Sequence, residues 1–233
     1  MKQFSNRYIF MFATVMVVIV AFVLSSAALF LQPMQQRNAE VEKKRNVLAS
    51  VGVEATAETA EELYDKYITK TLVVDVTGET RPGIDAFNVD MRKEQRKPVG
   101  EQALPVFIAS FEDGHTSYIM PLEGKGLWGP IYGYISLNND LRTINGVSFD
   151  HKSETPGLGA EINTTEFESQ FINKDLFQEN EFRGILVAKG GADDDDPHAV
   201  DGISGGTITS KALEAMIYDC LVNYVEYLKK NSN

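Results

Sequence analysis

The chain has 233 residues, 43% of them hydrophobic, and a formal net charge of −11 at pH 7. This composition is typical of a chain that folds, and the excess of acidic side chains excludes binding to nucleic acid through phosphate contacts. The single cysteine, Cys220, excludes an internal disulfide and a cysteine-ligated iron–sulfur cluster within the chain.

The first feature in chain order is an apolar stretch from Tyr8 to Leu31, and the next charged residue is Arg37. About 24 residues of helix span about 36 Å, which is enough to cross a bilayer with some tilt. A cleaved signal peptide is the alternative, because residues 26–28 resemble a cleavage site, but its apolar core would be shorter. We therefore predict a cytoplasmic N-terminus at residues 1–7 and a retained transmembrane helix at residues 8–32.

The basic residues that flank this helix are unequally distributed. Lys2 and Arg7 precede it, whereas Arg37 and the cluster at residues 43–45 follow it. By the positive-inside rule, this count would keep the following domain in the cytoplasm. However, the cluster lies about 12 residues beyond the helix, and a short, purely basic N-terminus favours an N-terminus held inside.

Residues 33–70 are predicted to form a helical linker region. From Pro33 to Val51, apolar residues recur at helical spacing between charged ones, and Gly52 ends this pattern. A second helix is expected at residues 56–69, with a threonine as its cap and acidic residues in its first turns.

Residues 71–233 are predicted to form one domain of the α+β class. Strand patterns alternate with turn signals such as Asp113-Gly114, so we expect a curved, mainly antiparallel sheet. The predicted strands are residues 72–76, 104–112, 116–122, 131–137, 143–149 and 184–189. Helices are predicted at residues 164–171 and 211–230, and residues 81–98 and 190–200 are predicted to be mostly loop.

A glycine turn directly precedes the last predicted helix. It lies in the segment 204–210 (Ser-Gly-Gly-Thr-Ile-Thr-Ser), where Thr209 or Ser210 is placed to cap the helix. Gly205 and Gly206 allow the backbone amides to turn around a small anion, and a hydroxyl beside a helix N-terminus lies where a phosphate is favoured. On these residues alone, a plain capping turn remains the alternative.

A second turn segment is residues 151–159 (His-Lys-Ser-Glu-Thr-Pro-Gly-Leu-Gly), in which Pro156 and the glycines predict a tight turn. By itself this segment indicates only a turn. Together, the two segments resemble the S-G-A-T-x-T-S and E-T-P-G-L-G motifs of a flavoprotein family. That family comprises NqrC, of the sodium-translocating NADH:quinone reductase, and its flavin-bearing relative in the Rnf complex. The difference is Gly206, which stands where the family usually has alanine.

The resemblance implies an FMN that is joined covalently through a phosphoester to Thr207 by a separate flavin transferase. It also implies a domain on the periplasmic side of the inner membrane, and we follow it although charge counting disagrees. Leu158 would pack on the ring face, Thr155 would hydrogen-bond the ring edge, and Lys189 would either neutralise the phosphate or remain solvated. Trp128 would either stack on the flavin or pack in the core. The cofactor-binding residues implied are Thr207, Ser204, Gly205, Gly206, Ile208, Thr209, Glu154, Thr155, Gly157, Leu158, Gly159, Trp128 and Lys189.

As a member of this family, the chain would relay electrons between an iron–sulfur centre and the flavin of a neighbouring membrane protein of the same complex, coupled to sodium export. Its partners would be the other subunits, the transferase and the membrane. We predict no metal site, because the acidic run at residues 193–196 and the three scattered histidines lack ligand spacing. The alternatives are the Rnf-type relative with the same FMN, and a non-redox, membrane-anchored module that binds a phosphate-bearing ligand.

Overall fold

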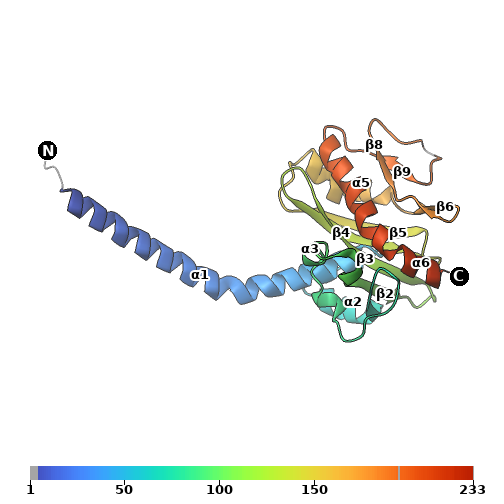
Figure 1. Ribbon diagram of the computed structural model, residues 1–233, viewed down its shortest axis with the longest axis horizontal. Helices are drawn as coiled ribbons and strands as arrows, with labels where there is room; N and C mark the ends of the chain where they lie inside the picture. The colour runs from blue at the N-terminus through green and yellow to red at the C-terminus, as the bar shows by residue number, and fades with distance from the viewer. Residues whose placement is uncertain (1–4, 194, 233) are drawn as a thin grey trace. The chain divides into compact units, whose positions relative to one another are not determined.

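The computed structural model describes residues 5–193 and 195–232. The chain forms two compact units, one ending at Lys43 and the other beginning at Lys44. The first unit consists of the N-terminal part of a long helix, α1 (Asn6–Ala49), and the last turns of that helix belong to the second unit (Figure 1).

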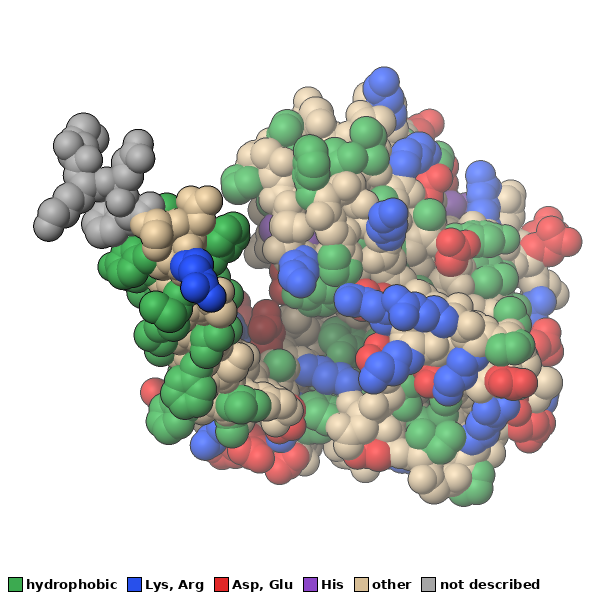
Figure 2. Space-filling view, turned by 60° about the vertical axis from the view of Figure 1, so that its left-hand side comes forward, with side chains coloured by type: hydrophobic (Ala, Val, Ile, Leu, Met, Phe, Trp, Pro, Cys, Tyr) green, Lys and Arg blue, Asp and Glu red, His purple; other side chains and the backbone are tan. Residues whose placement is uncertain are grey.

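Helix α1 carries the apolar stretch predicted to span the membrane. It continues without interruption through Pro33, so the predicted helical continuation beyond the apolar stretch is confirmed as far as Ala49. Its apolar side chains are exposed, for example Phe10 at 74% and Phe30 at 78%, and Figure 2 shows this hydrophobic covering. Within the described residues, α1 is the one helix long and apolar enough to cross a membrane.

The second unit is built on a five-stranded antiparallel sheet in which strands consecutive in the chain are also neighbours in space. The predicted alternation and the hairpin turn at Gly114, where φ is +85°, are therefore confirmed. The strands are β1 (Ile68–Val74), β2 (Leu104–Ser110), β3 (Thr116–Lys125), β4 (Pro130–Leu137) and β5 (Ile144–His151).

The first strand begins earlier than predicted. Helix α2 covers only Ala60–Tyr67, and residues 68–71, which we expected in that helix and in the turn after it, open strand β1. The prediction was wrong because Ile68 pairs with Ala109 of β2 and is buried there, at 8% exposed. Tertiary pairing of a β-branched residue thus outweighs the helical pattern of the preceding residues.

Successive residues of the central strands face opposite sides of the sheet and fill two separate cores. Phe107, Ile119 and Tyr134 belong to one core, whereas Val106 and Met120 belong to the other. The first core is covered by the end of α1, α2 and the loop after β1. Its side chains from the predicted linker region are Val47, Leu48, Val51, Tyr64 and Ile68.

The other face of the sheet is covered by the C-terminal helices, which cross it in Figure 1. These are α5 (Thr207–Leu221), the short 3-10 turn η4 (Val222–Tyr224) and α6 (Val225–Asn231). The start of the single helix predicted at residues 211–230 therefore lies four residues too late. Tyr224 anchors the break between the two helices, because its ring is fully buried and its hydroxyl donates to the Pro105 carbonyl at 3.0 Å.

Short elements fill the remainder of the unit. They are η1 (Ala86–Asn88), α3 (Met91–Glu94), η2 (Val99–Glu101), η3 (Gly159–Asn163), α4 (Thr165–Ser169), β6 (Phe177–Gln178), β7 (Glu181–Phe182), β8 (Leu186–Ala188) and β9 (Ala199–Asp201). Strand β8 confirms the centre of the strand predicted at 184–189. The loop predicted at 190–200 is wrong at its end, because Ala199 and Val200 are buried and pair in parallel with β8. This pairing brings the loops after β8 and β9 together at the start of α5.

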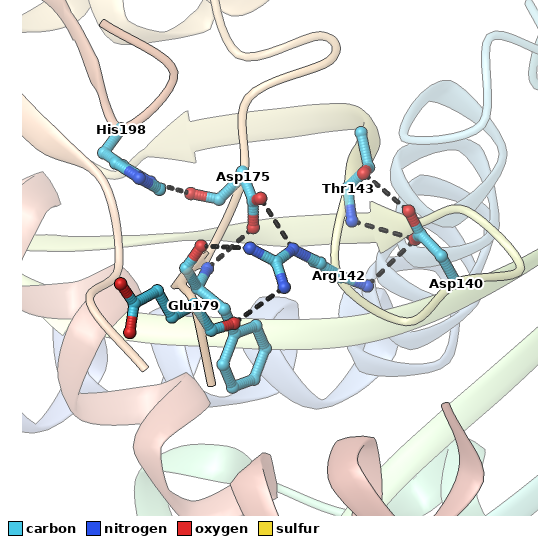
Figure 3. A network of polar contacts seen from close by, with 7 residues as sticks. Asp140, Arg142, Thr143, Asp175, Glu179 and His198 are labelled. Carbon is cyan, nitrogen blue, oxygen red and sulfur yellow. Dashed lines mark hydrogen bonds and ion pairs between the residues drawn. The ribbon is translucent and has the colours of Figure 1, made fainter. Parts of the chain in front are cut away.

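Arg142 joins the turn between β4 and β5 to the β6–β7 hairpin (Figure 3). Its Nε donates to Asp175 Oδ2 at 2.6 Å, and its terminal nitrogens donate to the carbonyl oxygens of Phe177 at 2.7 Å and Glu179 at 2.8 Å. Asp140 shapes the same turn by accepting from the Arg142 N–H at 3.0 Å. One planar guanidinium therefore fixes the hairpin through three separate acceptors.

Arg142→Lys is expected to lower the free energy of unfolding by about 1–2 kcal/mol, because an ammonium keeps the charge but cannot reach three divergent acceptors. Denaturant unfolding followed by circular dichroism measures this difference. Arg183→Lys is the control, since Arg183 is exposed and its side chain donates to the Gln178 side chain. Equal losses in the two variants would contradict the role given to Arg142.

Three aromatic rings hold α4 and the turn after it against β5, the strand that leads into the 151–159 segment. Phe171 is fully buried, and its ring centroid lies 5.2 Å from that of Phe149 and 5.5 Å from that of Phe167, both edge to face. Glu168 lies beside them, and its Oε1 accepts from the Phe149 N–H at 2.6 Å. Burial raises the pKa of Glu168 to about 7, and the nearby Asp150 raises it further, although the N–H bond opposes this.

The raised pKa of Glu168 predicts a pH-dependent loss of stability. The folded protein holds this proton more tightly than the unfolded chain, so stability should fall as the pH rises from about 4.5 to about 7. Glu168→Gln keeps the acceptor and removes the charge. Above pH 7 it should therefore raise the free energy of unfolding by about 1 kcal/mol, after allowance for solvent screening.

Urea unfolding of both proteins at pH 4.5 and pH 8 tests this, and the difference should disappear at the lower pH. Glu166→Gln, at an exposed position of α4, is the control and should show no difference at either pH. A Glu168→Gln effect that is the same at both pH values would show that ionisation is not its cause.

Candidate functional site

The first turn of α5 is the centre of the candidate site. Thr207 is the first helical residue and Gly206 is the N-cap, so the predicted cap at Thr209 or Ser210 is wrong. The turn before it is closed by a bond from the Gly206 N–H to the Ile203 carbonyl at 3.0 Å. No side chain caps this helix in the part of the chain described, so its first N–H groups are left to an outside acceptor.

Four hydroxyl groups lie in the segment 204–210, and tertiary contacts distinguish them. Thr209 is buried, at 2% exposed, and its hydroxyl donates to Glu154 Oε2 at 2.7 Å. Ser210 is also buried and accepts from the Ile203 N–H at 3.0 Å. Ser204 is exposed and Thr207 is half-buried, so these two carry the accessible hydroxyls of the segment.

Thr207 lines a pocket of about 440 Å³ between the start of α5 and the loops after β8 and β9. The wall opposite the helix includes Lys189, as predicted, and the helix itself adds Lys211, which the sequence reasoning missed. Lys211 is paired with Glu214 at 2.9 Å, whereas Lys189 is an exposed cation of the wall. Asp201 opposes them, with one oxygen accepting from the Ala192 N–H at 2.6 Å.

The segment 151–159 lies against the first turn of α5. Gly157 has a φ of +75°, and the Thr155 carbonyl accepts from the N–H groups of Leu158 and Ala160 at 3.1 Å, which confirms the predicted tight turn. Thr155 and Leu158 are exposed, and a Cβ at Gly205 would lie 2.6 Å from Leu158 Cδ2. Leu158 thus packs on the glycine turn that precedes Thr207.

Glu154 differs from its neighbours in the same segment. It is only 5% exposed, and Oε1 accepts from the Trp128 N–H at 2.8 Å while Oε2 accepts from Thr209. Ser153, which the sequence did not single out, donates to the Trp128 carbonyl at 2.9 Å. The structure therefore places the loop between β3 and β4 next to the start of α5, a proximity that no local sequence signal could give.

Exposed apolar side chains surround these contacts. Trp128 is 67% exposed, so the alternative in which it packs in the core is excluded. Leu127, Leu158 and Ile208 are 46%, 40% and 60% exposed, and Leu127 and Trp128 line a second groove of about 820 Å³ along α5. Large exposed apolar groups around one polar turn are typical of a surface that receives a planar ligand or a partner.

Comparison with known proteins identifies the family. Residues 126–222 match the family model of the FMN-binding domain. NqrC of the Na(+)-translocating NADH-quinone reductase of Vibrio vulnificus is 31% identical over 208 residues, which cover 82% of this chain and 81% of that protein. The chain belongs to the NqrC family. The corresponding protein of Pseudomonas aeruginosa is 27% identical over 93% of this chain and 92% of its own length.

Solved structures of NqrC proteins have the same fold. A crystal structure of NqrC from the Na(+)-translocating NADH-quinone reductase of Parabacteroides distasonis is 41% identical, with a TM-score of 0.79 over 85% of this chain and 96% of that one. Shewanella oneidensis NqrC is 27% identical, with a TM-score of 0.71 over 85% and 98%. The predicted α+β fold, with an apolar N-terminal helix and an FMN-binding domain, is therefore confirmed.

The residues of this NqrC-family chain fit an FMN phosphate at the start of α5. An accessible hydroxyl, an uncapped helix N-terminus and Lys189 line one pocket, which suits a doubly charged anion. The turn is also tight, because a Cβ at Gly206 would lie 2.9 Å from Ile203 Cγ2 and 3.3 Å from the Leu158 carbonyl carbon. The alanine usual in the family signature would require Ile203 to shift here.

Proposed function

We propose that the chain is the electron-relay NqrC protein of a sodium-translocating NADH:quinone reductase, and that it carries FMN joined to Thr207 by a phosphoester. The observation that carries the proposal is the position of Thr207. Its hydroxyl is at the first residue of an uncapped helix and in a pocket that also holds Lys189. The competing hydroxyls of Thr209 and Ser210 are buried in hydrogen bonds.

The side chains around Thr207 would bind and orient the flavin. Backbone N–H groups of the first turn and Lys189 would hold the phosphate, and the exposed Leu158, Ile208 and Trp128 offer apolar surface to the isoalloxazine ring. When bound, FMN supplies a carrier that accepts and gives up electrons one at a time. The task of this chain is to keep that carrier at the surface, where a partner protein can approach it.

Attachment would require a separate flavin transferase. Among the described residues, no carboxylate or imidazole is hydrogen-bonded to the Thr207 hydroxyl, so this chain offers no general base to activate a weak nucleophile. Residues 8–36 contain no ionisable side chain other than Tyr8, so sodium would cross the membrane through other subunits. In this proposal α1 anchors the chain with its N-terminus inside and its domain in the periplasm.

Two alternatives are tested together with the proposal. The Rnf-type relative has the same flavin chemistry, but the proteins named above belong to the NADH-quinone reductase. A non-redox module would hold its ligand without a covalent bond. Denaturing gel electrophoresis of protein expressed with a flavin transferase separates covalent from non-covalent binding, because fluorescence of an attached flavin should travel with the band. Intact mass should show one added FMN, and an unmodified 207 peptide would refute the proposal.

A further inference from the structure

Glu154 lies at the centre of the proposed flavin site, yet neither oxygen faces outward. Both are used within the protein, at 2.8 Å from the Trp128 N–H and 2.7 Å from the Thr209 hydroxyl. These two donors come from the loop between β3 and β4 and from the first turn of α5. One carboxylate thus ties the segment that presents the exposed Trp128 to the turn that presents Thr207.

The backbone around this carboxylate leaves room for it at two glycines. A Cβ at Gly126 would lie 2.6 Å from Glu154 Oε1, and a Cβ at Gly159 would lie 2.6 Å from Oε2. Ser153 completes the arrangement by donating to the Trp128 carbonyl, so both polar groups of the Trp128 backbone are held by adjacent residues of one loop. A site shaped this closely fits a carboxylate that must keep one position.

The chemistry of these bonds makes them strong enough to set geometry. Hydrogen bonds to an ionised acceptor are shorter and about twice as strong as neutral ones. Removing the acceptor would leave a buried N–H and a buried hydroxyl without partners, which is costly. The loop of Trp128 would then be free to move relative to α5, since its side chain is exposed and has little packing of its own.

We propose that Glu154 is a positioning residue of the flavin site, which sets the placement of Trp128 relative to Thr207 and hence the surface on which the isoalloxazine ring rests. This inference rests on the proposed function, because it takes a flavin at Thr207. It differs from the sequence-based expectation, in which Glu154 contacts the flavin itself.

Trp128 provides a direct readout, because it is the single tryptophan of the chain. Its fluorescence is quenched by energy transfer and contact when a flavin lies near, and the quenching depends steeply on distance. The measurement is the ratio of tryptophan emission in flavin-free protein, made without the transferase, to that in flavin-loaded full-length protein. We expect a large ratio for the native chain. Glu154→Ala should move the ratio toward one, with flavin content by intact mass unchanged.

Conservative variants separate positioning from folding. In Glu154→Gln the amide oxygen can accept a hydrogen bond from one of the two donors, and the side chain keeps its length, so most of the native ratio should be retained. Thr209→Val removes the link to α5 alone and should lower the ratio, and it carries the test if Glu154→Ala does not fold. Glu161→Gln is the matched control, because the Glu161 side chain accepts the Gly157 N–H within the same segment and so bridges no distant element.

The outcomes separate this inference from the proposed function. Absence of FMN from the native chain would refute the proposed function. Flavin-loaded Glu154→Ala or Thr209→Val protein with native quenching would refute the positioning role and leave the function standing. Loss of quenching in Glu161→Gln as well would also refute it, because the effect would then belong to the whole segment.

Discussion

Replacing Thr207 by alanine is expected to abolish covalent FMN while the domain remains folded. The substitution removes the oxygen that the phosphoester requires. Thr207 is half-buried at the first position of α5, where alanine is an excellent helix former, so the change in stability should be below about 1 kcal/mol. The protein is expressed with the flavin transferase and analysed by intact mass and by fluorescence of the denatured band. The mass of one FMN and the fluorescence should both be lost.

Two further variants make this result specific. Thr207→Ser keeps a hydroxyl at the same place and should retain measurable flavin. Ser204→Ala removes the other accessible hydroxyl of the segment and should leave the flavin content unchanged. Flavin that persists in Thr207→Ala but disappears in Ser204→Ala would move the attachment point to Ser204 and overturn the assignment.

Replacing Phe171 by alanine is expected to produce the largest loss of stability among the variants considered. The ring is fully buried between Phe149 and Phe167, so its removal leaves a cavity that rigid neighbours cannot fill. The expected loss is about 3–5 kcal/mol in the free energy of unfolding, measured by urea or guanidinium denaturation followed by circular dichroism.

Ile172 offers the comparison for Phe171. It is the next residue in the chain but is 48% exposed, so Ile172→Ala should change stability by less than about 1 kcal/mol. Phe171→Leu, which keeps much of the volume, should fall between the two alanine variants. A Phe171→Ala loss no larger than that of Ile172→Ala would contradict the packing role of the aromatic group.

The features that the sequence predicted well are those governed by neighbours in the chain. Strand patterns separated by turn residues located β2 to β5, because successive side chains of a strand must meet the two cores on opposite sides of the sheet. The unbroken apolar run located α1, and Asp113-Gly114 located a hairpin. The two short motifs led to the family to which the chain belongs.

The errors arose where a distant partner decides the local structure. Ile68 enters a strand because β2 supplies its pairing, and residues 199–201 form β9 because β8 lies beside them. Thr209 and Ser210 have good capping side chains, but Glu154 and the Ile203 N–H occupy them, so α5 begins at Thr207. Each competing contact joins residues that are separated in the chain, or depends on a fold that local propensity does not contain.

The sequence by itself determined the class of fold, the order of the main elements and the family, because these depend on hydrophobic periodicity and short motifs. Only the tertiary structure decided which hydroxyls remain accessible, that Trp128 lies outside the core, and that Glu154 bonds to protein on both sides. The physical reason is that burial and hydrogen-bond pairing are properties of segments brought together by folding. Glu154 and Thr209, which are 55 residues apart, meet only when the loop after β5 closes against the start of α5.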